Sequence, residues 1–552
     1  MVETFGDDDS ETKFARRLGL AGATNIGLGA MLGGGIYVIS GIAAGRIGPA
    51  IVLAYLVAGI LSVFTAVNYA ELACSIPKQG GGYTFVHDVY GGSPAFATGW
   101  FLFIGNTVAC GLYSIAVAHT LAVFIPGSTL VTVGIIAFVL VIITAITNAV
   151  SVKGVASVLG ILNIAQTCVL ILFIGAGVFF IDSANLTTLV AEGAGTFEFI
   201  ATVSFVFISF VGFEMVTTAS EEIKEPHKNI PRAIMLTILI ATIVYMLATF
   251  VIVGIAGYEN VATSERPIAD VFILFSGKFG YFLGLAGMAA SNYAALNATF
   301  LASSRVAYSL GRDNYFPKAL QKVHPTRKVP LQALLLSLII ASAVALTGSA
   351  EFAAYLADFG YLVGLTLVNA SVMGLRRKNL SVQGVFKSPF FPAFPILAIV
   401  SHLILVPFLH IEVLILGVIG TIFGVIVYYG YSKGKKHTHK VRVLTLDEAR
   451  QEYPPFEMSI LKEHFDINEP FEEELELSLK DDCEELAVRK KEENQEIVPE
   501  CEEVDEKAEK DAPEEVDSED VSEDKEDECS TDEVNPDSKL EVIEEDAESE
   551  ND

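Results

Sequence analysis

Three consecutive glycines stand in the middle of the first long apolar segment of the chain. The segment runs from Leu18 to Ala44, and its centre contains Gly33, Gly34 and Gly35. A run of about 20 or more apolar residues is long enough to cross a bilayer. Each glycine in a helix interior, however, costs roughly 1 kcal/mol relative to alanine. We therefore expect a membrane-spanning helix that opens near its middle.

An opened helix exposes backbone groups that a continuous helix would pair internally. Inside a membrane such groups are tolerated only where they line a cavity or meet a ligand. The N–H groups at the start of the second half attract a carboxylate, and the C=O groups at the end of the first half attract an ammonium group or a metal cation. A free amino acid carries both charges. The alternative interpretation is that the glycines only permit close helix packing.

Apolar runs of membrane-spanning length occur twelve times along the chain. The sequence thus predicts an all-α integral membrane protein, with a twelve-helix domain at 18–431 and an N-terminal segment at 1–17. The expected spans lie near 18–44, 50–75, 95–124, 129–149, 155–181, 198–220, 232–256, 279–310, 331–348, 352–375, 394–410 and 412–431.

The distribution of lysine and arginine predicts the orientation. With a cytoplasmic N-terminus, the inner loops carry fifteen of these residues and the outer loops carry three. Positive residues concentrate on the cytoplasmic side of membrane proteins. We therefore expect both termini in the cytoplasm and a multi-pass protein of the cell (plasma) membrane.

The formal charge divides the chain into two unlike parts. Residues 1–446 contain 26 Lys+Arg and 21 Asp+Glu, a net charge of +5, whereas residues 447–552 contain 10 and 45, a net charge of −35. The acidic tail has too few apolar residues to offset chain entropy, so we predict that it is largely disordered. The basic segment 432–446 suits anionic lipid headgroups. The tail binds a basic protein partner, contacts the basic inner loops of the same chain, or serves only as a solvated appendage.

The sixth expected span repeats the character of the first. Its stretch from Phe205 to Glu214 carries Gly212 and an ionisable residue near mid-membrane. Two interrupted spans five apart indicate an inverted repeat of five helices, with a binding site at the interface of the repeats. Spans eleven and twelve lie outside this repeat. After span six, Pro231 is expected to begin the next helix, because proline suits a first helical turn.

Other classes of protein find little support. The glycine-rich loop at 77–83 lacks the order of a phosphate-binding loop. The chain has no spacing typical of a catalytic triad or a metal cluster, so we expect no enzyme activity, no cofactor and no nucleic-acid partner.

Five motifs, in order, resemble those of the amino acid–polyamine–organocation (APC) transporters across residues 12–431. They are the glycine-rich first span, Pro77…Gly81-Gly82-Tyr83, Phe210-Val211-Gly212-Phe213-Glu214, Glu221-Glu222…Pro226…Asn229-Ile230-Pro231-Arg232-Ala233-Ile234, and Ser304-Arg305-Val306…Gly311-Arg312-Asp313…Pro317. The resemblance implies a LeuT-like fold of five-plus-five inverted repeats with discontinuous helices 1 and 6. It also implies alternating access and amino acids or polyamines as substrates.

The resemblance also implies positions for the substrate. The substrate carboxylate would meet the backbone amides around Gly33, Gly34 and Gly35, and its ammonium would meet carbonyls near Met31, Ile208 and Val211. Ile208 stands where some relatives place a gating aromatic residue. The pocket is then either roomier here or gated by Phe207 or Phe210.

The residues do not decide which ion, if any, drives transport. Several proton-coupled relatives carry a lysine where this chain has Gln166, and a glutamine does not titrate. Sodium at a site near span one with Ser291 and Asn292, a proton on Glu214, and exchange without an ion are the alternatives. Glu214 is interpreted either as a gate or proton acceptor or as a residue that holds the broken helix. Glu71 and Asp358 are interpreted as structural or interfacial.

The substrate class follows from charge. The third span, Gly99 to Thr120, has no carboxylate to neutralise a cationic substrate side chain, and a buried charge without a partner is costly. We therefore expect an ion-coupled secondary amino acid transporter for neutral or broad-range amino acids. The alternatives are a cationic amino acid or polyamine exchanger, a passive channel, and, in another class, a membrane sensor or scaffold that signals through the acidic tail. The oligomeric state is not predicted.

Overall fold

The computed structural model of the chain describes residues 18–76, 80–150, 152–218, 220, 223–324, 327, 329–378, 380 and 386–433. The predicted N-terminal segment 1–17, most of the basic segment and the acidic tail 447–552 lie outside the described residues. Within the described ranges the regular structure is helical, apart from one parallel bridge between Leu18 and Ile223.

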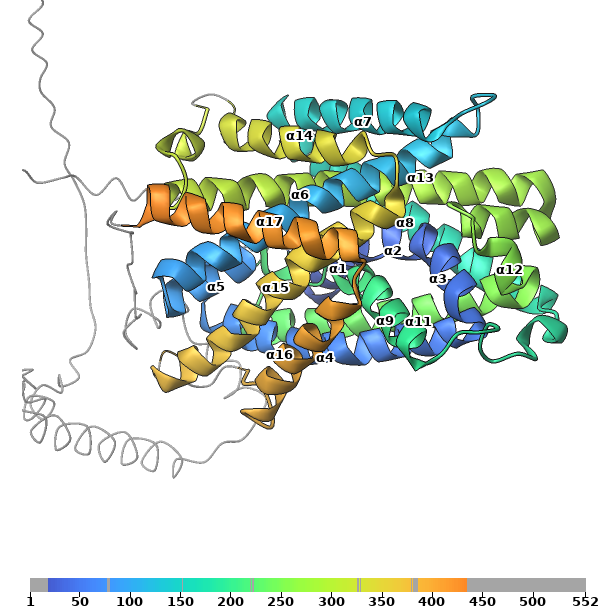
Figure 1. Cartoon of the computed structure of the whole chain (residues 1–552), viewed down its shortest axis with the longest axis horizontal. Helices are drawn as coiled ribbons and strands as arrows, with labels where there is room; N and C mark the ends of the chain where they lie inside the picture. Colours follow the sequence, from blue (N-terminus) through green and yellow to red (C-terminus); the bar gives the residue numbers. More distant parts are fainter. Residues whose placement is uncertain are drawn as a thin grey trace, which may run out of the picture. The chain divides into compact units, whose positions relative to one another are not determined.

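Long apolar helices make up most of the described chain (Figure 1). They are α4 (Ile51–Ser75), α6 (Gly92–Ala122), α7 (Leu130–Val150), α8 (Val152–Gly177), α9 (Thr196–Phe207), α11 (Pro226–Ala256), α13 (Pro267–Arg312), α14 (Leu331–Ala345), α15 (Ala350–Arg377), α16 (Ala393–Leu405) and α17 (Ile411–Val427). Shorter helices include α1 (Leu20–Met31), α2 (Gly34–Tyr37), α3 (Ile39–Ile47), α5 (Gly81–Val89), α10 (Met215–Thr218) and α12 (Tyr258–Val261).

Nine helices among the described residues are long and apolar enough to cross a membrane. Two more apolar helices, Leu331–Ala345 and Ala393–Phe408, are shorter, and the first expected span is divided into α1, α2 and α3. One candidate, Ile39–Ser75, joins the end of the first expected span to the second. The all-helical membrane fold is therefore confirmed, while the count of twelve spans and the inverted repeat stay predictions.

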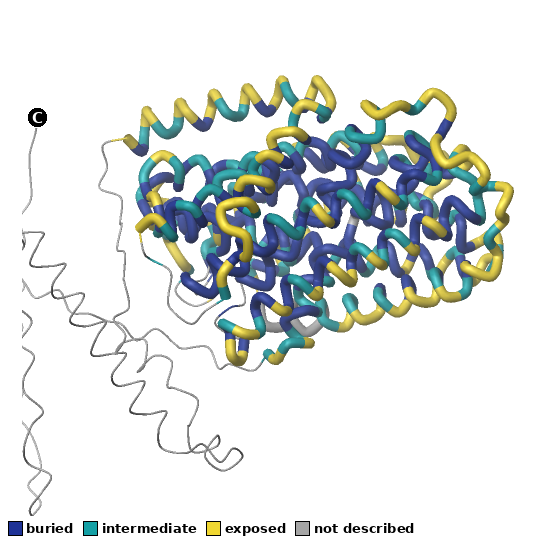
Figure 2. The backbone as a smooth tube through the Cα atoms, turned by 90° about the horizontal axis from the view of Figure 1, so that it is seen from below, coloured by how far each residue is buried: buried dark blue, intermediate teal, exposed yellow. Residues whose placement is uncertain are grey.

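Burial separates inner helices from outer ones. In the most apolar stretch of α6, 89% of the residues are buried, and α6 packs against α13, α14 and α15. The corresponding stretch of the outer helix α17 is only 17% buried. Figure 2 shows exposed residues along outer helices and loops around a buried interior. Because the exposed side chains of α17 are mainly aliphatic, that surface suits lipid rather than water.

Two helix starts differ from expectation. The seventh span begins at Pro226, so Pro231 lies inside α11 instead of at its first turn. Proline lacks the N–H that would bond the carbonyl four residues earlier. That carbonyl, of His227, instead accepts a bond from the Cys74 thiol at 3.5 Å. Helix α13 starts at Pro267, but Gly277, with φ 60° and ψ −154°, divides it at a kink, so the helix after the kink begins close to 279, where the eighth span was expected.

Candidate functional site

The first predicted break lies between α1 and α2. Helix α1 ends at Met31, and Leu32 has φ −72° and ψ 27°, outside the helical range. The chain becomes helical again at Gly34, is interrupted once more at Val38, and continues as α3. We call Leu32–Gly33 the first break. It falls at the glycine triplet, as the sequence predicts.

The second break follows α9. A single 3₁₀ turn, η4 (Ile208–Phe210), leads to Val211 in an extended conformation with ψ 132°. Gly212 then has φ 131°, which an L side chain rarely adopts, and α10 begins at Met215. We call residues 208–214 the second break. Both helices predicted to be discontinuous are therefore interrupted where expected.

The two breaks touch each other through glycine. A Cβ atom on Gly35 would lie 2.4 Å from the Cβ of Ser209, and one on Gly212 would lie 2.9 Å from the carbonyl carbon of Ala30. Real Cβ atoms do not approach other atoms so closely. Glycine at these two positions therefore permits the close approach of the two discontinuous helices.

A tyrosine that the sequence analysis missed ties the breaks together. The hydroxyl group of Tyr245 on α11 lies 2.5 Å from the carbonyl oxygen of Met31 and 2.7 Å from that of Ser209. The hydroxyl group of Tyr55 on α4 donates to the carbonyl of Gly35 at 2.7 Å. A tyrosine in the middle of an apolar span was the available signal, because a buried phenol needs a polar partner.

Several predicted substrate ligands already have partners in this conformation. The Met31 carbonyl interacts with Tyr245, and the Ile208 carbonyl accepts from the Val211 amide at 3.1 Å. A carbonyl oxygen has two lone pairs, so each can still accept a second bond. Gly33 lies beside the ring of Tyr113 on α6, where an added Cβ atom would be 3.3 Å from the ring.

Glu214 is held inside the second break. Its side chain is 9% exposed, and the amide of Gly212 donates to its Oε2 at 2.7 Å. The Thr217 hydroxyl donates to the backbone carbonyl of Glu214 at 2.6 Å. These contacts favour the interpretation in which Glu214 stabilises the broken helix.

The two gating candidates face different neighbours. Phe210 packs edge-on against the Tyr245 ring, with centroids 5.3 Å apart, and also against Tyr55. Phe207 packs against His402 of α16, with centroids 5.3 Å apart. Of the two, Phe210 is the one beside the residues that join the breaks.

The predicted ion-site residues are only partly brought together. The Ser291 hydroxyl of α13 donates to the Leu32 carbonyl at the first break. Asn292 donates to the Met288 carbonyl of its own helix at 2.8 Å. The side chain of Gln166 is fully buried with no hydrogen-bond partner among the described residues, although its backbone carbonyl accepts from Tyr37. Ser291 therefore adjoins the break, whereas the side chain of Gln166 makes no hydrogen bond to it among the described residues.

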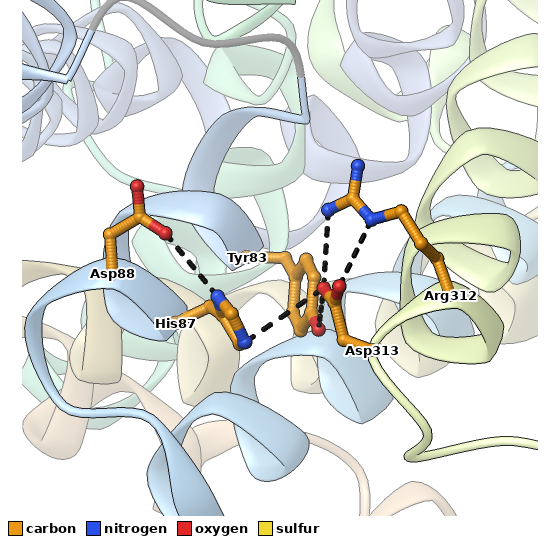
Figure 3. Close-up of polar contacts among 5 residues, drawn as sticks. All are labelled: Tyr83, His87, Asp88, Arg312 and Asp313. Atoms are coloured by element: carbon orange, nitrogen blue, oxygen red, sulfur yellow. Dashed lines mark hydrogen bonds and ion pairs between the residues drawn. The ribbon is translucent and has the colours of Figure 1, made fainter. Parts of the chain in front are cut away.

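One polar cluster joins α5 to the end of α13 (Figure 3). The Tyr83 hydroxyl donates to Asp313 at 2.7 Å, and Arg312 donates to the same carboxylate at 3.0 and 3.2 Å. His87 lies between Asp88, at 3.3 Å, and Asp313, at 3.9 Å. Burial and the neighbouring Asp313 carboxylate raise the pKa of Tyr83, which keeps its hydroxyl group a donor.

A second polar cluster lies where α3 meets α15. Arg46 contacts the hydroxyl of Tyr355 and the carboxylate of Glu351, and its guanidinium lies 4.7 Å from the Phe205 ring centre. Through these contacts of Arg46, helix α3 is joined to α15 and to α9, the helix that precedes the second break.

A polar cavity of about 480 Å³ adjoins the loop before α13. It is lined by His119 and Glu265, whose Nε2 and Oε2 atoms are 4.0 Å apart, and by Arg266. Burial and the nearby Glu351 raise the pKa of Glu265 to about 7, against the opposing effect of Arg266.

Glu71 and Asp358 have opposite surroundings. Glu71 receives two bonds from Arg376, at 2.7 and 2.8 Å, and one from the Ser388 amide at 2.8 Å, so its structural interpretation agrees with its contacts. Asp358 is fully buried, and neither carboxylate oxygen has a hydrogen-bond partner among the described residues.

Comparisons with known proteins agree with this architecture. The family model described as amino acid permease matches residues 18–441. The branched-chain amino acid permease BcaP of Bacillus subtilis is 28% identical over 451 residues, which cover 78% of this chain and 95% of that protein. The methylthioribose transporter of the same species is 28% identical over 419 residues, with 72% and 89% covered.

A plant relative is named as a cationic amino acid transporter. The vacuolar cationic amino acid transporter 4 of Arabidopsis thaliana is 26% identical over 389 residues, which cover 67% of this chain and 64% of that protein. Together with the apolar helices, the family match indicates a multi-pass membrane protein. This chain belongs to the amino acid permease family.

Proposed function

We propose that this permease is a secondary active transporter of neutral or broad-range amino acids that works by alternating access and is coupled to an ion. The observation that carries the proposal is the contact between two helix breaks. Amides at the start of the second half of a broken helix suit a carboxylate, and carbonyls at the end of the first half suit an ammonium group. These are the two groups that all free amino acids share.

The substrate class is inferred from charge and from relatives. Helix α6 contains no Asp or Glu, and the Glu214 carboxylate already accepts from the Gly212 amide. A substrate with a cationic side chain would therefore meet no evident anionic partner at these two places. The names of the branched-chain permeases among the relatives favour the same conclusion.

A cationic amino acid or polyamine exchanger is the second candidate. It is favoured by the vacuolar cationic amino acid transporters of Arabidopsis among the relatives. Uptake inhibited by arginine or putrescine, but not by leucine or alanine, would support this candidate instead.

The remaining predictions on topology belong to the same proposal. We infer twelve spans arranged as an inverted repeat, a location in the plasma membrane and cytoplasmic termini, from the positions of apolar runs and of Lys and Arg. Cysteine labelling of an otherwise cysteine-free variant from either side of a sealed membrane tests the orientation.

The decisive experiment is uptake into liposomes that contain the purified protein. Labelled leucine, alanine, arginine and putrescine are offered under a sodium gradient, a proton gradient, neither gradient, or against preloaded substrate. Saturable uptake of amino acids supports the proposal. Binding without uptake of any amino acid or amine would refute it and favour the sensor or scaffold.

Removal of residues 435–552 separates the transporter from the sensor. A transporter keeps its uptake after this deletion, because its substrate site lies in the helical domain. A sensor that signals through its acidic tail loses its output while it still binds ligand. Unsaturable flux without accumulation against a gradient would instead identify a passive channel.

A further inference from the structure

Asp358 is a buried acid that the described contacts leave without a partner. Its side chain in α15 is 0% exposed, and both carboxylate oxygens lack a hydrogen-bond partner among the described residues. The other deeply buried carboxylates behave differently. Glu71 is bonded to Arg376, Glu214 to the Gly212 amide, and Asp313 to Tyr83 and Arg312.

The position of Asp358 is level with the second break. One turn earlier on α15, the ring of Tyr355 packs against that of Phe205 in α9, with centroids 4.6 Å apart. The turn that follows Phe205 is η4, and η4 itself contacts α15. Because one helical turn rises about 5.4 Å, Asp358 lies at the height of η4.

Helix α6 covers the same level of α15 from another side. Tyr361, one turn after Asp358, donates to the Oδ1 atom of Asn106 at 3.1 Å. Gly360 lies so close to α6 that an added Cβ atom would be 2.8 Å from the Gly105 amide nitrogen. Asp358 therefore belongs to the layer in which α6, α15 and the second break meet.

Charged and titratable side chains also lie on the elements packed against α15, and none of them is hydrogen-bonded to Asp358. They are Arg46 of α3, Tyr55, Tyr69, Glu71 and Cys74 of α4, Tyr83, His87 and Asp88 of α5, Cys110, Tyr113 and His119 of α6, Glu198 of α9, Glu214 of the second break, His402 of α16, and His410 and Glu412 beside α17. Arg46 binds Glu351, and His402 lies between Thr65 and Thr366 at 3.1 and 3.4 Å. No described cation is paired with Asp358.

Charge and burial together restrict the protonation state. An ionised carboxylate without a partner is expensive inside a protein, and more so at membrane depth. In the arrangement described, with Asp358 fully buried, its side chain is therefore expected to be a neutral carboxylic acid. When the transporter opens to water on one side, the same group can ionise and release its proton.

We propose that Asp358 carries the coupling proton of this transporter. The proposal rests on the proposed function, since it names the coupling ion and the residue that holds it. In the outward-open state the carboxylate takes a proton from external water, and only the neutral acid permits closure. In the inward-open state the O–H bond breaks, the electron pair stays on the carboxylate, and the proton passes to cytoplasmic water.

The structure gives reasons to prefer Asp358 over the two coupling sites predicted from the sequence. Glu214 already accepts from the Gly212 amide at 2.7 Å, so one of its oxygens has a partner. At the predicted sodium site, the Ser291 hydroxyl and the Leu32 carbonyl bond each other, while the Oδ1 atom of Asn292 and the amide of Gln166 lack partners but do not titrate. Asp358 is therefore the buried titratable acid that has no partner on either oxygen among the described residues.

The experiment uses the full chain in liposomes with the membrane potential clamped at zero. A pH difference of one unit, acidic outside, corresponds to about 1.4 kcal/mol and supports about tenfold accumulation for one proton per substrate. Wild type should approach this ratio. Asp358→Asn should only equilibrate the substrate, at a ratio of about one, while counterflow exchange of substrate for substrate continues.

Two further variants keep the test decisive. Asp358→Glu retains a titratable acid, so it should accumulate substrate with a shifted pH profile even if the asparagine variant fails to fold. Glu259→Gln changes an exposed acid on α12 and should behave as wild type.

Each outcome has one meaning. Loss of proton-driven accumulation with counterflow retained in Asp358→Asn supports the proposal. The proposal is overturned if Asp358→Asn still accumulates substrate, if only Glu214→Gln loses accumulation, or if only a sodium gradient drives uptake. It is also overturned if Asp358→Asn cannot be folded and Asp358→Glu does not accumulate substrate. If wild type moves no amino acid under any gradient or by counterflow, the proposed function itself has failed.

Discussion

Replacing Tyr245 by phenylalanine tests whether one hydroxyl group holds the two breaks together. The change deletes a single oxygen atom that lies 2.5 Å from the Met31 carbonyl and 2.7 Å from the Ser209 carbonyl. The ring itself is fully buried and packs against Phe210 and Tyr55. Phenylalanine keeps that packing, so the measured effect comes from hydrogen bonding.

The expected magnitude follows from the two contacts. The Tyr245 hydroxyl has one proton, which the Met31 and Ser209 carbonyls share, so the change removes one hydrogen bond that contributes a net ~0.5–1.5 kcal/mol to stability. This range corresponds to roughly a 2- to 12-fold change in an equilibrium constant. Tyr55→Phe removes the bond to the Gly35 carbonyl and should cost a similar amount.

The free energy of unfolding in detergent micelles, measured by denaturant titration, provides the readout. Tyr429→Phe is the matched control, since Tyr429 is 59% exposed and should change stability by less than about 0.5 kcal/mol. Transport in liposomes is measured in parallel, because loosening the breaks should change the balance of closed and open states. A Tyr245→Phe protein as stable as the Tyr429→Phe control would refute the assignment of this shared hydrogen bond.

Three other substitutions test separate parts of the structure. The pKa of Glu265 rises from 4.5 to about 7 on folding. Its contribution to the free energy of unfolding is therefore full below pH 4.5 and is lost as the pH rises through 7. The thermal midpoint should fall between these pH values, and it should fall by less in Glu265→Gln. Glu71→Ala removes both bonds from Arg376, whose side chain is 21% exposed, and should lower the free energy of unfolding by about 3 kcal/mol in denaturant titrations. Adding Arg376→Met to this variant should restore part of that free energy, because no buried cation is then left without a partner. Gly35→Ala should abolish uptake because its Cβ would overlap Ser209, whereas Gly160→Ala, with open space around it, should transport as wild type; equal uptake by the two variants would contradict the close approach of the breaks.

The positions of the breaks could be predicted because their cause is local. The glycine triplet at 33–35 and the single Gly212 weaken a helix wherever they occur in an apolar span, and the structure interrupts both helices there. The partners of the breaks could not be predicted in the same way. Tyr245 lies 36 residues from Ser209 and 214 from Met31 in the chain, and only the folded arrangement brings it to both carbonyls.

Helix starts were less predictable than spans. Hydropathy locates the part of a helix that suits lipid, whereas the helix itself begins where backbone geometry and capping allow. Helix α13 therefore includes a segment from Pro267 that hydropathy did not locate, whereas its part after the kink at Gly277 begins near the expected residue 279. Helix α11 tolerates Pro231 near its start because the Cys74 thiol takes over the carbonyl that the proline leaves open.

Two buried carboxylates show why a sequence alone does not assign a coupling residue. Glu214 and Asp358 are both acids in apolar spans; the sequence left Glu214 open between a functional and a structural role, and Asp358 was interpreted as structural or interfacial. In the structure the break that makes Glu214 conspicuous also supplies its partner, the Gly212 amide two residues away. Asp358 lies in an unbroken helix with no such local donor, and packing against α6 and the second break removes it from water. We therefore propose that the helix breaks bind the substrate, and we seek the residue that couples a proton where burial leaves an acid without a partner.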